Sequence, residues 1–151
     1  MPNSVRYSFS QRFNVAAQEA FNWCVDFDPG DHSLMGDKSA ERQITKLNES
    51  TIILKEKFRS TGGIAEKEKL VQLYPDQLFW VSTHLTGPNR YSQFLYRIIP
   101  DGNETSALQF TGLHLDYKST ENGDALAKKL CAEDANAWKL LAKSMENDLR
   151  T

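Results

Sequence analysis

Most of the chain consists of short segments in which apolar and polar residues alternate. In the first segment, residues 4–13, Val5, Tyr7 and Phe9 alternate with polar residues, and this period of two predicts a β-strand. Six further segments of this kind follow, each ended by a turn signal: 42–47, 51–59, 64–73, 78–85, 91–99 and 105–117. Because the connections between them are short, we expect antiparallel neighbours in chain order, which is a meander.

Two segments have the spacing of a helix. After Asn14, a plausible N-cap, apolar residues recur at helical spacing until the breaker D-P-G-D at residues 28–31, and this predicts a helix between them. The last segment runs from Asp124, a second candidate N-cap, to Leu149 without a glycine or a proline. An advance of about 100° per residue places six apolar residues on one face of this long helix: Leu126, Leu130, Trp138, Leu141, Met145 and Leu149.

The order strand, helix, six-stranded meander, long helix predicts the α+β class. We expect a seven-stranded, curved antiparallel sheet wrapped around the C-terminal helix, with short helices after the first strand. The chain has 151 residues, of which 40% are hydrophobic, and no repeat or linker divides it. We therefore expect a single domain over residues 1–151.

The turns predict which strand residues face inward. A hairpin closed at 87–89 pairs Trp80 with Tyr96 and Ser82 with Phe94, and the turn after residue 100 pairs Tyr96 with Leu108 and Phe94 with Phe110. Both pairings place the same set on one face, which we take as the concave face: Leu78, Trp80, Ser82, His84, Phe94, Tyr96, Ile98, Leu108, Phe110 and His114.

The hairpin of segments 51–59 and 64–73 sorts its charges by sign. Its lysines, at 55, 57, 67 and 69, are expected on the outer, solvated face. Its three glutamates are expected on the apolar face: Glu56, Glu66 and Glu68. Ionised carboxylates are rarely buried without a partner. Either these glutamates line a wet cavity, or the strands extend beyond the core and both faces are wet, which is the interpretation we favour.

Charge and cysteine content exclude several function classes. The chain has 18 basic and 20 acidic residues and a pI of about 5.9. Nucleic-acid-binding domains usually carry a basic stripe, so we expect no nucleic-acid partner. No segment is apolar enough for a signal peptide or a membrane span, so we expect a cytoplasmic protein without stable membrane insertion. Cys24 and Cys131 are expected to be free thiols, with a disulfide between the first and last helices as the alternative.

The titratable residues suggest one polar site in an apolar environment. Asp134 lies in the middle of the apolar face of the last helix, so it needs a partner or its pKa rises. The candidate partners are His84, His114, Arg90 and Arg97. Alternatively, the helix is rotated so that Asp134 contacts water.

The histidines have two interpretations. His84 and His114 are either half-exposed, hydrogen-bonded residues near strand ends or polar anchors in a cavity, and His32 lies in the breaker loop. The sequence contains neither paired metal-binding histidines nor a nucleotide-binding motif, so we predict no metal and no cofactor.

The inward-facing aromatic residues, with Trp138 of the last helix, would be sufficient to fill a core. However, the hydroxyl groups of Ser82, Ser92 and Tyr96 are expected on the same side, and hydroxyl groups without partners are costly in a dry core. This combination favours a cavity between sheet and helix.

The order of elements resembles the START-related, birch-pollen-allergen-like helix-grip superfamily, also called SRPBCC. The resemblance rests on the opening strand 4–13, N-V-A-A-Q-E-A-F-N-W at 14–23, D-F-D-P-G at 26–30, L-T-G-P-N at 85–89 and the closing helix. Within the superfamily, the chain is most similar to the polyketide cyclase/dehydrase and lipid-transport branch. The resemblance implies an elongated apolar cavity that takes lipids, polyketides or sterols, but it carries over no catalytic residue. Glu56, Glu66 and Glu68 make the sheet unusually acidic for a carrier of purely apolar ligands.

Three functions follow from these observations. The first is binding of a small hydrophobic or amphipathic molecule, such as a lipid, polyketide or sterol, by seven residues: Trp80, Ser82, Phe94, Tyr96, Phe110, Leu130 and Trp138. The alternative is a cyclase, dehydratase or isomerase in which Asp134 forms an acid–base pair with His84 or His114. A co-chaperone-type interaction module ranks third. A monomer and a dimer are both compatible with the sequence.

Overall fold

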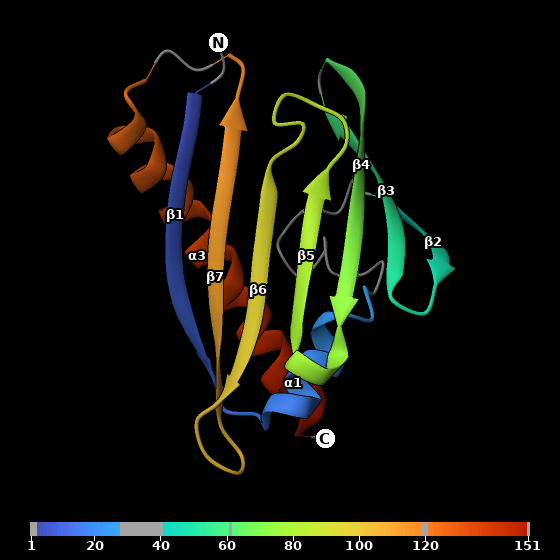
Figure 1. Ribbon diagram of the computed structural model, residues 1–151, viewed down its shortest axis with the longest axis vertical. Helices are drawn as coiled ribbons and strands as arrows, with labels where there is room; N and C mark the ends of the chain where they lie inside the picture. The colour runs from blue at the N-terminus through green and yellow to red at the C-terminus, as the bar shows by residue number, and fades with distance from the viewer. Residues whose placement is uncertain (1–2, 28–40, 61, 119–120, 151) are drawn as a thin grey trace.

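The computed structural model describes residues 3–27, 41–60, 62–118 and 121–150. This part of the chain forms seven strands, two α-helices and one short 3-10 helix (Figure 1). In chain order they are β1 (Asn3–Phe13), α1 (Ala17–Cys24), β2 (Glu41–Asn48), β3 (Thr51–Ser60), β4 (Gly63–Tyr74), η1 (Pro75–Gln77), β5 (Phe79–His84), β6 (Gln93–Pro100), β7 (Ser106–Asp116) and α3 (Gly123–Leu149). The predicted α+β fold is confirmed. The breaker at 28–31 and His32 lie outside the described residues.

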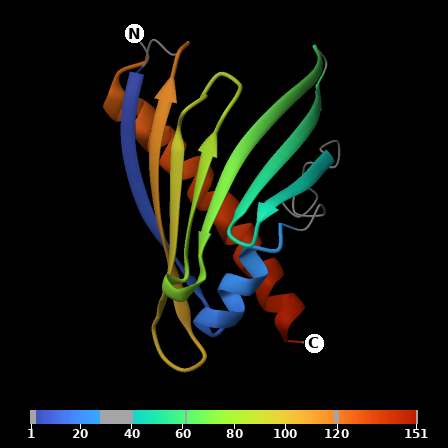
Figure 2. The ribbon, with the colours of Figure 1, turned by 45° about the vertical axis from the view of Figure 1, so that its right-hand side comes forward.

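All seven strands belong to one antiparallel sheet with the order β1-β7-β6-β5-β4-β3-β2. The six-stranded meander is therefore confirmed, and β1 joins it beside β7. Figures 1 and 2 show α3 crossing one face of the curved sheet diagonally, from the start of β1 to the end where α1 lies. This arrangement leaves the inner face of the sheet opposite α3.

The helices begin at residues other than the predicted caps. Ala16 is the N-cap of α1, while the backbone N–H of Asn14 donates to Glu146 of α3 at 3.0 Å. Helix α3 is capped by Asn122, whose side chain accepts a hydrogen bond from the N–H of Ala125 at 2.8 Å. An Asn side chain at this position satisfies a backbone donor of the first turn.

Helix α3 is amphipathic, as predicted. Leu126, Leu141 and Met145 are buried, and Leu130 and Trp138 are half-buried. Leu149 is 42% exposed, so its predicted place on the buried face is wrong, because the last turn of α3 lies beyond the strands (Figure 2). Among the described residues, no helix is long and apolar enough to span a membrane.

The register of β5, β6 and β7 places the predicted residues on the inner face. Trp80 lies opposite Tyr96 and Ser82 opposite Phe94, as predicted. Across the next hairpin, Tyr96 lies opposite Phe110 instead of Leu108. This second pairing was wrong by two residues, because the loop between β6 and β7 is longer than we assumed. A shift by two residues leaves every side chain on its predicted face, since side chains alternate with period two.

The predicted register of β3 and β4 was wrong by one residue, which moves one whole strand to the other face. Ser60 lies opposite Gly63, a glycine with a φ of 123°. Consequently, Glu56 lies opposite Lys67, and Leu54 opposite Lys69. The inner face of this hairpin carries Ile52, Leu54, Glu56, Lys67, Lys69 and Val71, whereas Glu66 and Glu68 face outward opposite Lys57 and Lys55.

Candidate functional site

A cavity of about 440 Å³ lies between the inner face of the sheet and α3. This volume falls within the usual range for small-molecule sites. All ten residues that the sequence suggested for the site line it: Trp80, Ser82, His84, Phe94, Tyr96, Phe110, His114, Leu130, Asp134 and Trp138. The structure therefore brings together residues from β5, β6, β7 and α3.

One wall of the cavity is a row of aromatic rings across three strands. Trp80 of β5 stacks on Tyr96 of β6 with ring centroids 4.8 Å apart and planes 4° apart. Tyr96 makes an edge contact with Phe110 of β7 at 5.2 Å, and Trp138 of α3 lies 5.8 Å from Tyr96. Such contacts stabilise a fixed arrangement of rings, so this wall is preformed.

Asp134 faces this cavity from α3 and is held by Tyr7 of β1. The hydroxyl of Tyr7 donates to Asp134 Oδ2 at 2.5 Å. Burial raises the pKa of the Asp134 carboxyl, and the hydrogen bond from Tyr7 partly opposes this by stabilising the carboxylate. Burial, followed by the bond to Asp134, raises the pKa of Tyr7, so the phenol stays a neutral donor.

Among the predicted partners of Asp134, His114 interacts with it electrostatically and lowers the pKa of the carboxyl. Arg90 lies over the ring of Tyr117 at 4.1 Å, and Arg97 over the ring of Phe79 at 4.9 Å, so neither holds Asp134. The two histidines line the same cavity, but the hydrogen bond to Asp134 comes from Tyr7.

Tyr7 was missed because its position depends on the pairing of β1 with β7, the first and the last strand of the chain. It lies opposite Gly112 of β7, and a Cβ atom at Gly112 would be 2.6 Å from Tyr7 Cζ. The glycine therefore leaves the space that the phenol ring occupies. Two features of the sequence point to Tyr7. The alternating pattern of the first strand places Tyr7 on the inner face, and a glycine in the middle of a strand often marks a close approach of a neighbouring group.

His84 is a neutral, buried histidine with a defined hydrogen bond. It is 7% exposed, and its Nδ1 lies 3.1 Å from Asn89 Oδ1. Because an amide oxygen can only accept, Nδ1 donates, and Nε2 is left as an acceptor. Burial and then the nearby Lys69 lower the pKa of His84 to about 3.

His114 offers an unused polar atom. It is also 7% exposed, so the half-exposed interpretation is wrong for both histidines. Among the described residues, nothing hydrogen-bonds to its buried Nδ1, and its Nε2 lies 3.9 Å from Asp116 Oδ2. Burial lowers the pKa of His114, so its ring is held in the neutral form.

The hydroxyl groups differ in what they imply. Ser82 is buried and lines the cavity, as expected. The hydroxyl of Ser92, in contrast, accepts from the N–H of Leu115 at 2.8 Å and needs no cavity. Cys24 lines the cavity, and neither Cys24 nor Cys131 forms a disulfide, so the alternative of a disulfide between the helices is not realised.

The wall of the cavity formed by β2 and β4 is charged, and the sequence analysis did not predict this. Three cations from β2 and β4 line it: Arg42, Lys67 and Lys69. Glu56 has an exposed fraction of 0% and contacts Lys69 Nζ at 2.5 Å and Arg42 Nη2 at 3.3 Å. Neither interpretation of the inner glutamates describes Glu56, which belongs to a buried ion-paired cluster. Lys67 and Lys69 were missed because the register prediction had placed them outside.

No protein-family model and no curated protein matches the sequence, but solved structures match nearly all of it. The Zhui aromatase/cyclase from Streptomyces sp. R1128 has a TM-score of 0.72 at 11% identity, over 97% of this chain and 93% of its own. A START superfamily protein from Mycobacterium smegmatis gives 0.66 at 17% identity, over 96% and 97%. Norcoclaurine synthase from Thalictrum flavum, in complex with dopamine and hydroxybenzaldehyde, gives 0.68 at 12% identity, over 98% and 87%.

The chain has a helix-grip fold, as these solved structures do. At these identities the comparison shows the fold, and it confirms the fold that the sequence resemblance implied. In this helix-grip chain the cavity lies where the long helix crosses the curved sheet.

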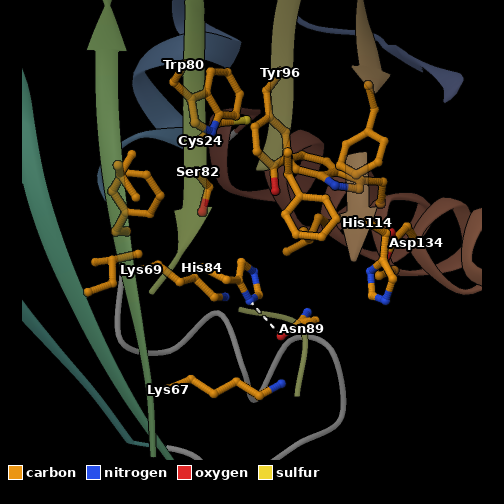
Figure 3. A pocket seen from close by; sticks show the side chains of 18 of the residues that line it. Cys24, Lys67, Lys69, Trp80, Ser82, His84, Asn89, Tyr96, His114 and Asp134 are labelled. Carbon is orange, nitrogen blue, oxygen red and sulfur yellow. Dashed lines mark hydrogen bonds between the residues drawn. The ribbon is translucent and has the colours of Figure 1, made fainter. Parts of the chain in front are cut away.

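The polar groups of the helix-grip cavity form two separate sets. Figure 3 shows Lys67, Lys69, His84 and Asn89 on one side of the pocket and His114 with Asp134 on the other, with Trp80 and Tyr96 farther along the cavity. Apolar walls with a few convergent polar groups are typical of small-molecule sites. This arrangement can bind a molecule with an apolar body and polar groups at both ends.

Proposed function

We propose that this helix-grip protein binds a small amphipathic molecule in the cavity between the sheet and α3. The observation that carries the proposal is the cavity of about 440 Å³, which is lined by packed aromatic rings and a few polar side chains. The preformed aromatic wall supports the proposal, because it offers an apolar body a rigid surface.

The ligand class is a finer proposal. We expect a lipid, polyketide or sterol-like molecule, and the two structural neighbours named as an aromatase/cyclase and as a synthase with bound dopamine and hydroxybenzaldehyde are consistent with an aromatic body. A cytoplasmic location belongs to the same proposal.

The test uses an uncharged fluorescent probe, N-phenyl-1-naphthylamine, and a variant that fills the cavity. Ala137 of α3 lines the cavity, whereas Ala132 of the same helix is exposed. We expect saturable binding to the unchanged protein and to Ala132→Trp, and at least tenfold weaker binding to Ala137→Trp, with cooperative thermal unfolding of all three as the folding control. Equal binding by the two tryptophan variants, or no saturable binding at all, would contradict the proposal.

A second candidate function, acid–base catalysis on a polyketide-like substrate, is favoured by the state of Asp134. A buried carboxyl whose pKa lies above its ordinary value is a candidate for general acid–base chemistry. With a pKa of about 3, His84 is a weak base, which favours Asp134 with Tyr7 over the predicted pair of Asp134 and His84.

This second function has its own measurement. We expect the protein to accelerate exchange of the α-protons of 1-tetralone in D₂O, followed by NMR. The variant Asp134→Asn should lose this acceleration by about 10²-fold. An unchanged rate in Asp134→Asn, with probe binding intact, would exclude the catalytic role and leave the binding function in place.

A further inference from the structure

We propose that the ligand carries an anionic group and that Lys67, supported by Lys69, binds this group at the β4 side of the cavity. The inference rests on the proposed binding function and specifies the ligand. It makes the molecule an amphipathic acid rather than a neutral lipid or sterol.

The first argument is the excess of positive charge. Arg42, Lys67 and Lys69 line this side of the cavity, and Glu56 contacts two of them, Arg42 and Lys69. Lys67 lies opposite Glu56 in the sheet, but none of the described carboxylates forms an ion pair with its amino group. The Nζ atom of Lys67 lies over the ring of Phe58, 5.3 Å from its centroid. Two positive charges close together in a half-buried site are stabilised by an anion.

Apart from Glu56, which already contacts Arg42 and Lys69, the described neighbours of Lys67 on the inner face supply no anion. His84 lies opposite Lys69 on the inner face and is neutral. Within the described part of the chain, the acidic residues that line the cavity are Glu133 and Asp134 of α3, and Asp134 lies on the other side of the pocket (Figure 3). Burial and the charge of Lys69 lower the pKa of Lys67, and the negative charge of Glu56 opposes this lowering only in part.

The two sides of the cavity also set the orientation of a ligand. Inward-facing residues on β4 run from Lys69 through Val71 to Leu73, which lies opposite Trp80. At about 3.3 Å per residue, Lys69 and Leu73 are roughly 13 Å apart along the strand. An anion bound at the lysines would therefore place an apolar body of that length along the aromatic wall. The negative charge of Asp134 disfavours the reversed orientation.

The experiment compares two probes with the same aromatic body. 1-Anilinonaphthalene-8-sulfonate differs from N-phenyl-1-naphthylamine by its sulfonate group alone. We expect the sulfonate probe to bind the unchanged protein at least tenfold more tightly than the neutral probe. As a second matched pair, decanoate should displace the bound sulfonate at least fivefold more effectively than decanol.

Two substitutions test whether Lys67 causes the preference for the anionic probe. Lys67→Met should weaken binding of the sulfonate probe five- to tenfold and change binding of the neutral probe less than twofold. Lys57→Met is the matched control, because Lys57 is on the outer face, where it pairs with Glu66 at 3.6 Å; it should change neither. Lys69 is left intact, since its removal would take a partner from the buried Glu56.

The outcomes separate the two proposals. Equal affinity for both probes, or equal effects of Lys67→Met and Lys57→Met, would overturn the anionic site while leaving the cavity as a binding site. Saturable binding of neither probe would overturn the proposed function and this inference with it.

Discussion

The inner face of the sheet has two halves that are stabilised in different ways. In β5–β7, the rings of Trp80 and Phe110 are 3% and 2% exposed, and both pack against Tyr96. In β2–β4, the fully buried carboxylate of Glu56 is compensated by Arg42 and Lys69. The first half depends on burial of apolar surface, whereas the second depends on keeping a buried charge paired.

The two halves of the inner face suit the two parts of an amphipathic ligand. The aromatic half tolerates any apolar body that fits, since dispersion and burial are not directional. The charged half selects by sign, because cations in a half-buried site discriminate strongly between anions and neutral groups. Four substitutions test this contrast.

The largest effect is expected from Glu56→Gln. The change leaves Arg42 and Lys69 without their buried counter-charge, and loss of one partner of such a group costs about 3–5 kcal/mol. Urea denaturation measures the free energy of unfolding of both variants. The matched control is Glu66→Gln on the outer face, where the ion pair with Lys57 is exposed and its loss should change stability by no more than about 1 kcal/mol. Similar values for the two variants would contradict the two-half account.

The next effect concerns the aromatic half. In Gly112→Ala the added methyl group would lie 2.6 Å from Tyr7 Cζ, and relief of such overpacking costs about 1–3 kcal/mol. The Tyr7 ring must then move away from Asp134, so the nearby ring signals should shift in NMR spectra. A variant as stable as the unchanged protein would show that Tyr7 does not pack on Gly112.

The third effect is a pH dependence from the neutral His84. Its pKa is near 6.5 in the unfolded chain and about 3 in the folded protein, so between these values the unfolded state binds the additional proton. The corresponding stability is present above pH 6.5 and is lost as the pH falls towards 3. We expect unfolding at pH 5 to require about 1–2 kcal/mol less than at pH 7. His84→Asn should reduce this difference, with the remainder due to His114, whose pKa is also lowered; a variant with an unchanged pH profile would contradict the assignment.

The smallest effect is expected from Tyr7→Phe. Without the phenol donor the Asp134 carboxylate is less stabilised, so the pKa of Asp134 should rise further above its ordinary value. Carboxyl ¹³C NMR titration measures this shift, and the loss in stability should be about 1 kcal/mol. Tyr117→Phe is the control, because its hydroxyl donates to the carbonyl of Arg90 at 3.2 Å at the surface. A pKa of Asp134 that stays constant or falls would be inconsistent with the hydrogen bond.

The two halves also differed in how well the sequence predicted them. In β5–β7, strong alternation and clear turns placed the inner residues on the right face, even where the pairing of Tyr96 was wrong by two positions. In β3–β4, charged residues occupy both faces, so the apolar pattern did not fix the register. An error of one residue in the predicted register placed the side chains of β4 on the wrong face. Strands of this kind are weakly specified by local sequence.

The candidate site was also predicted only in part from the sequence. The helical period placed Asp134 correctly on the face of α3 that lines the cavity. Its partner Tyr7 could not be derived in this way, because their contact joins β1 to α3 across most of the chain. The cationic cluster became visible only with the β3–β4 register.

The central claim is that the space between sheet and α3 holds a guest molecule, and a crystal structure with bound 1-anilinonaphthalene-8-sulfonate tests it most directly. We expect electron density for the naphthalene ring against Trp80 and Tyr96, and a sulfonate oxygen within about 4 Å of Lys67 Nζ. Density on the outer surface of the sheet, with the interior closed by the protein's own side chains, would contradict the claim.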